Sequence, residues 1–72
     1  MSGRLSYRGF EIHATPYKLE AGGWTHEGNL VEHRGATTRE TKFFAGGSSE
    51  TREQAVEAVI VEGKRLIDFR SQ

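Results

Sequence analysis

The stretch Thr51–Phe69, TREQAVEAVIVEGKRLIDF, decides the fold because its apolar residues recur with helical spacing over several turns. Thr51 and Gln54 have the spacing of a capping box. In that motif the threonine hydroxyl accepts the Gln54 amide, and the Gln54 side chain reaches back to the Thr51 amide. Acidic residues come early in the stretch and basic residues late, which suits the dipole of a helix. The sequence therefore predicts one amphipathic helix over residues 51–69.

The apolar side of this helix needs a sheet to pack against. Three earlier segments have the composition of β-strands, over residues 5–15, 24–33 and 37–45, and turn-forming residues separate them. Gly9 interrupts the alternation of the first segment, where we expect a bulge or bend. The connector at residues 46–49 is too short for a crossover to a parallel strand. We therefore expect one α+β domain over residues 1–72, a three-stranded antiparallel meander packed against a C-terminal helix (β-β-β-α).

The predicted core combines one face of the helix with alternate residues of the strands. In a regular strand only one of Phe43 and Phe44 can point inward, and the choice is open although we place Phe44 in the core. Gly28 and Gly63 are expected to lie opposite each other, where strand and helix backbones approach closely. The full predicted core is Phe10, Ile12, Trp24, Leu30, Phe44, Val56, Val59, Ile60, Gly63, Leu66 and Ile67.

Composition limits the classes to which the chain can belong. With 72 residues and 35% hydrophobic content it can build one modest core. It has no cysteine, so neither disulfides nor a thiolate zinc site can supplement that core. No apolar run approaches the roughly 18 residues of a membrane span. We expect a soluble cytoplasmic protein without a membrane partner.

The charges of the chain balance overall and locally. Ten basic residues face ten acidic ones, with six of each in residues 1–50 and four of each in residues 51–72. A protein dedicated to nucleic acid usually presents a basic patch or stripe. Nucleic acid is therefore a possible but disfavoured partner.

Several short segments together suggest a known family: YRGFEI at residues 7–12, GGW at 22–24, Phe44, TREQA at 51–55 and GKRLID at 63–68. In these segments the chain resembles small bacterial proteins of the HlyU-like family. Some members of that family carry a transcriptional-activator label. The resemblance covers nearly the whole chain but implies no catalytic, cofactor or binding residue, because its motifs are mostly structural positions.

A weaker likeness connects Tyr7-Arg8-Gly9, Trp24 and the helix start at residues 51–55 to three-stranded DNA-binding domains of the plant AP2 and phage integrase type. This likeness implies a sheet that enters the major groove with basic residues on its outer face. The outer face expected here carries Glu11, His13, Thr25, Glu27 and Asn29 instead. Acids therefore occupy positions where phosphate contacts need bases.

The three histidines, His13, His26 and His33, raise the question of a metal site. Their spacings of thirteen and seven residues match no local ligand motif. His26 is predicted on the face toward the helix and His13 on the opposite face, so we expect no convergence and no metal. Glu11 and Glu27 share the exposed face, but a flat and wet sheet gives paired carboxylates no cleft. We therefore predict no catalytic residue, no cofactor and no enzymatic activity.

The uncovered sheet face and the outward Val31 and Val61 favour an interaction surface. The predicted function is a non-enzymatic protein-interaction module, with an unknown protein partner or a second copy as homodimer. The alternative is a DNA-binding transcriptional regulator that uses the exposed sheet face. The candidate surface for either partner consists of Arg8, His13, Thr25, Glu27, Val31, Arg39 and Thr41.

Overall fold

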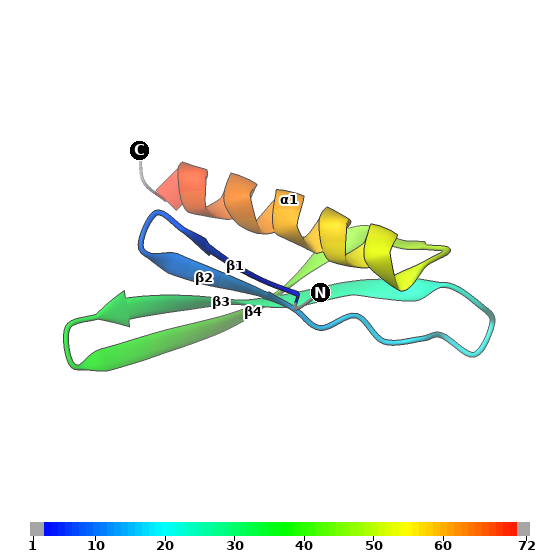
Figure 1. Ribbon diagram of the computed structural model, residues 1–72, viewed down its shortest axis with the longest axis horizontal. Coiled ribbons are helices and arrows are strands. Elements are labelled where there is room, and N and C mark those ends of the chain that lie inside the picture. The colour runs from blue at the N-terminus through cyan, green and yellow to red at the C-terminus, as the bar shows by residue number, and fades with distance from the viewer. Residues whose placement is uncertain (1–2, 71–72) are drawn as a thin grey trace.

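The computed structural model describes residues 3–70, which form four strands and one helix. In chain order these elements are β1 (Arg4–Tyr7), β2 (Phe10–Ala14), β3 (Trp24–Arg34), β4 (Thr37–Ser49) and α1 (Arg52–Arg70). The strands make one antiparallel sheet in the order β1-β2-β3-β4, and α1 lies across one face of it (Figure 1). The predicted α+β meander with a C-terminal helix is confirmed, whereas the predicted number of three strands is wrong.

The additional strand arises because the first predicted segment turns back on itself at Arg8-Gly9. The φ angles are 51° at Arg8 and 83° at Gly9, and Tyr7 pairs with Phe10 across the turn. Positive φ at both central residues is typical of a type I′ turn, whose twist matches that of the two strands it joins. The segment 5–15 is thus the β1–β2 hairpin, and the bulge expected at Gly9 is a turn.

The helix begins with the predicted capping box. The Gln54 amide donates to Thr51 Oγ1 at 3.1 Å, and the Thr51 amide donates to Gln54 Oε1 at 3.3 Å. These two bonds satisfy donors that the first turn of a helix leaves without intrahelical partners. The observed helix, Arg52–Arg70, agrees with the predicted range of residues 51–69.

The core lies between α1 and the sheet, and its fully buried aliphatic side chains are Ile12, Leu30, Val59 and Ile67. The predicted place of Phe44 is wrong, because Phe44 is 61% exposed and Phe43 only 9%. Phe43 pairs with Gly28 across the strands, and the missing side chain of that glycine leaves room for its ring. Four of the remaining predicted side chains are half-buried and pack against this centre: Phe10, Val56, Ile60 and Leu66. Trp24 is also half-buried but is not part of this cluster.

Gly28 and Gly63 both permit close packing, but each faces an aliphatic side chain. A Cβ atom at Gly28 would overlap Cγ1 of Val59, and one at Gly63 would lie 2.8 Å from Cγ2 of Ile12. Gly63 therefore packs on Ile12 instead of on Gly28. The helix approaches the sheet closely because a strand glycine meets a helix side chain and a helix glycine meets a strand side chain.

Candidate functional site

The sheet face turned away from α1, here called the outer face, carries most of the predicted surface residues. Ile12 and Leu30 point toward α1, so the residues that alternate with them lie on the opposite face. From β2 and β3 the outer face receives Glu11, His13, Thr25, Glu27, Asn29, Val31 and His33. The register of β4 adds Glu40, Lys42 and Phe44.

Three of the seven predicted surface residues lie elsewhere. Arg39 pairs with Glu32 and Thr41 with Leu30, which places both on the side of the sheet that faces α1. Arg8 lies in the β1–β2 turn, where its Nη1 is 3.2 Å from Oδ1 of Asp68 in α1. Only His13, Thr25, Glu27 and Val31 share the outer face as one surface.

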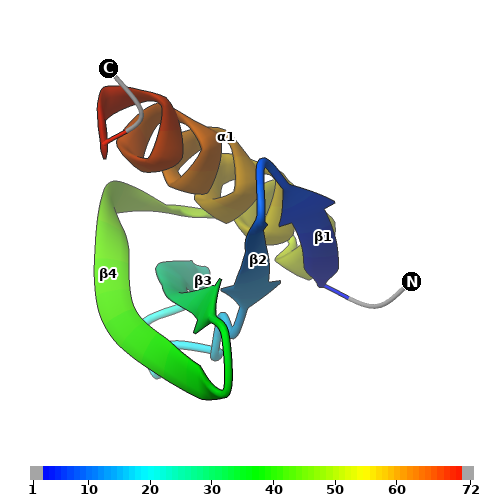
Figure 2. The same ribbon diagram turned by 90° about the vertical axis from the view of Figure 1, so that its left-hand side faces the viewer.

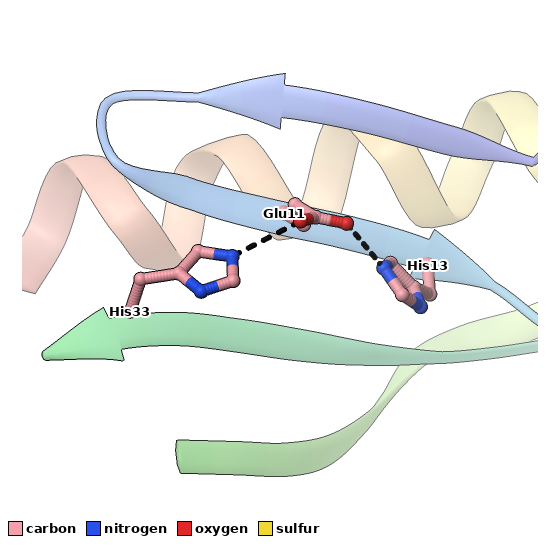
Figure 3. Close-up of polar contacts among 3 residues, drawn as sticks. All are labelled: Glu11, His13 and His33. Carbon is pink, nitrogen blue, oxygen red and sulfur yellow. Dashed lines mark hydrogen bonds and ion pairs between the residues drawn. The ribbon is translucent and has the colours of Figure 1, made fainter. Parts of the chain in front are cut away.

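Glu11 is the centre of a polar cluster on the outer face. His13 Nε2 lies 2.8 Å from its Oε1, and His33 Nε2 lies 3.0 Å from its Oε2 (Figure 3). Since an ionised carboxylate only accepts hydrogen bonds, both Nε2 atoms carry a proton and donate it. These two bonds hold the pKa of Glu11 below its usual value, and the bond from His13 has the larger effect.

The three histidines do not converge as a group, but His13 and His33 meet at Glu11. They are far apart in sequence, but the pairing of Glu11 with Val31 brings the end of β3 beside β2. His26 lies on the other face, as predicted; it is 8% exposed, and its Nε2 is 2.6 Å from Ser49 Oγ. Within residues 3–70, no group of three or more His, Cys, Asp or Glu side chains could hold a metal ion.

Glu11 and Glu27 do not form a pair of carboxylates. Glu27 lies opposite Phe44, and Lys42 Nζ is 3.9 Å from its Oε2. Glu11 is opposite Val31, four residues further along β3, which corresponds to roughly 13 Å at the rise of a strand. Each acid therefore has its own basic or histidine partners, and the face supplies no shared proton-transfer site.

The edge strand β4 is the element that the sequence predicted least well. It runs over thirteen residues to Ser49, past the predicted end at residue 45. One side pairs with β3, and within the described residues no strand lies along the other side. Its outer face alternates Glu40, Lys42 and Phe44. The sequence contains the same alternation. Placing Phe43 in the core would have put Glu40, Lys42 and Phe44 on the outer face.

Comparison of the chain with protein-family models, curated proteins and solved structures finds no match in any of the three. Among the residues that the structure describes, no helix is long and apolar enough to cross a membrane.

Proposed function

We propose that this chain is a non-enzymatic module that acts by pairing with a second copy of itself along β4. The observation that carries the proposal is the length of this free edge: β4 has thirteen residues, of which 37–44 pair with β3 without a register shift, against four residues for β1 at the other edge. A strand at the edge of a sheet presents a row of unpaired N–H and C=O groups that can template another strand. An equivalent strand would satisfy those groups and continue the sheet.

The charges along β4 favour one register of such a pair. Two antiparallel copies centred on Thr41 place Glu40 of each copy opposite Lys42 of the other, so the symmetry makes this contact twice. Directly opposed unlike charges stabilise a strand pair by roughly 0.2–1 kcal/mol each. In the same register Phe44 lies opposite Thr38 at both ends, which covers part of its exposed ring.

Charge reversal tests the register. Glu40→Lys alone sets lysine against lysine, and Lys42→Glu alone sets glutamate against glutamate, so each variant should be monomeric. An equimolar mixture restores both unlike contacts and should associate. The double variant E40K/K42E should also recover self-association. Sedimentation velocity over a concentration series measures each state, and Glu53→Lys in α1 serves as a charge-reversed control away from β4.

Two outcomes would contradict the proposal. The first is a wild-type chain that stays monomeric up to roughly millimolar concentration. Its association free energy would then be weaker than about −4 kcal/mol, which is too weak for a functional dimer. Association that persists in both single variants uses another surface.

The alternative function, a DNA-binding transcriptional regulator, receives less support from the same surface. The outer face carries Glu11, Glu27 and Glu40 beside Lys42, while Arg39 lies on the other side of the sheet. Phosphate binding needs uncompensated bases and weakens steeply with salt. We expect that duplex DNA at low salt leaves the amide resonances of β2 to β4 unchanged. Saturable, salt-sensitive shifts there would favour the regulator.

A further inference from the structure

A group of arginines converges at the end of the molecule where α1 and the β3–β4 hairpin stop. Figure 2 views the molecule from this end, with the last turn of α1 and the β3–β4 hairpin on the near side. Glu32 pairs with Phe10 on one flank and with Arg39 on the other, so these three side chains lie in a row on the face toward α1. Arg34 follows on the same face, and Arg70 ends the helix.

These residues enclose an open hollow of about 480 Å³. Its lining consists of Phe10, Glu32, Arg34, Arg39 and Arg70. Side chains from β2, β3, β4 and α1 thus contribute to one concavity. A scattered set of solvated surface arginines would point away from one another, whereas these three share a common space.

The hollow has an excess of positive charge. Glu32 is the one acid among the described residues that line it, and Glu32 Oε2 lies 3.1 Å from Nε of Arg34. Within residues 3–70, Arg39 and Arg70 form no ion pair. Among residues 3–70, three guanidinium groups against one carboxylate leave two positive charges uncompensated, although the whole chain has no net charge.

Arg70 also has a simpler role, because a basic residue in the last turn complements the negative end of the helix dipole. That role does not account for Arg39, which comes from β4 and faces the same hollow. It also does not account for Phe10, whose half-buried ring forms an apolar wall beside the guanidinium groups.

We propose that this hollow binds a small phosphate monoester. The dianionic phosphate compensates the two excess charges, and its oxygens accept the paired N–H groups of Arg39 and Arg70. The volume exceeds that of a phosphate group alone, so the organic part of the ligand lies against Phe10. This inference does not depend on the pairing of β4, because ligand binding can be measured on the monomer.

Titration followed by ¹H–¹⁵N spectra tests the proposal, at a protein concentration where sedimentation shows a monomer. The probes are inorganic phosphate, glycerol 3-phosphate and phenyl phosphate, with sodium chloride at matched ionic strength as reference. Saturable shifts of the Arg34, Arg39 and Arg70 side-chain Nε–H resonances are expected with the phosphates and not with chloride. Phenyl phosphate should bind tightest because its ring contacts Phe10, and glycerol 3-phosphate should bind about as weakly as inorganic phosphate.

Matched arginine variants decide the result. Arg39→Gln and Arg70→Gln should each weaken phenyl phosphate binding on the order of tenfold, since each removes a charged hydrogen-bond donor. Arg52→Gln, at the opposite end of α1, should leave the affinity unchanged. Equal affinity in all three variants, or shifts that follow ionic strength alone, would overturn the phosphate site. All three positions are exposed, and the dispersion of the amide spectrum verifies folding.

Discussion

The β1–β2 and β3–β4 hairpins have two-residue turns of the same length, but only the first is held against the helix. At its turn, the Tyr7 hydroxyl donates to Oδ1 of Asp68 in α1 at 2.8 Å, and Arg8 forms an ion pair with the same carboxylate. Among the described residues, the tip of β3–β4 has no hydrogen bond or ion pair to α1, and residues 33–40 are exposed. The turn of the first hairpin is therefore tied to the helix, whereas the tip of the second provides surface.

The largest expected effect separates the interior of the first hairpin from the surface of the second. Ile12 in β2 is fully buried against Gly63, so Ile12→Ala leaves a cavity and should lower the free energy of unfolding by about 2–5 kcal/mol. Phe44→Ala in β4 removes a larger but exposed side chain and should change it by less than about 0.5 kcal/mol. Urea denaturation of the monomer measures both.

Equal losses in these two variants would contradict the assignment of Phe43 to the core and Phe44 to the surface. Phe43→Ala provides the matched control. It should cost about 3 kcal/mol because its ring packs over Gly28.

A smaller effect distinguishes the two turns. An alanine Cβ meets no atom within 4 Å at either Gly9 or Gly35, so any cost comes from the backbone conformation alone. At Gly9 the φ of 83° lies beyond the usual left-handed region, and Gly9→Ala should cost about 1–2 kcal/mol. At Gly35 the φ is 58° and the φ of Ala36 is negative, so this turn has the pattern of type II′, in which the first central residue is glycine. Gly35→Ala should therefore cost more than Gly9→Ala, about 2–3 kcal/mol. Thermal unfolding of the two variants measures the order, and a larger loss at Gly9 would contradict it.

The sequence predicted those elements whose determinants are local. The helix and its first residue follow from Thr51 and Gln54, which bond each other in the structure as the motif requires. The antiparallel order follows from short connections between successive strands. Both depend on residues a few positions apart, and tertiary context did not change them.

The errors concern features that depend on pairing between distant residues. Arg8-Gly9 lacks the Asn-Gly or Asp-Gly signal of a type I′ turn, and contacts from Asp68, sixty residues later, accompany the unusual Arg8 conformation. Opposite Phe43 lies Gly28, which decides which phenylalanine is buried, and only the β3–β4 register identifies that neighbour. In the same way, the β2–β3 register brings His33 beside Glu11.

The smallest expected effect depends on pH and concerns Glu11, which His33 links to the second hairpin. His33 of β3 and His13 of β2 both donate to Glu11, and the strand neighbours of Glu11, Ser6 and Val31, do not titrate near its range. Because the pKa of Glu11 is lowered in the folded state, its ionised form stabilises the fold above the ordinary value of 4.5. That contribution is lost as the pH falls through the lowered pKa.

The difference in unfolding free energy between wild type and Glu11→Gln should therefore be largest near neutral pH and shrink below pH 4.5. His13→Ala should reduce this acid dependence more than His33→Ala, since the bond from His13 has the larger effect on the pKa. Urea denaturation of the four proteins between neutral and acidic pH measures these differences. A constant difference between wild type and Glu11→Gln at every pH would mean that the two histidine bonds do not lower the pKa of Glu11 in solution.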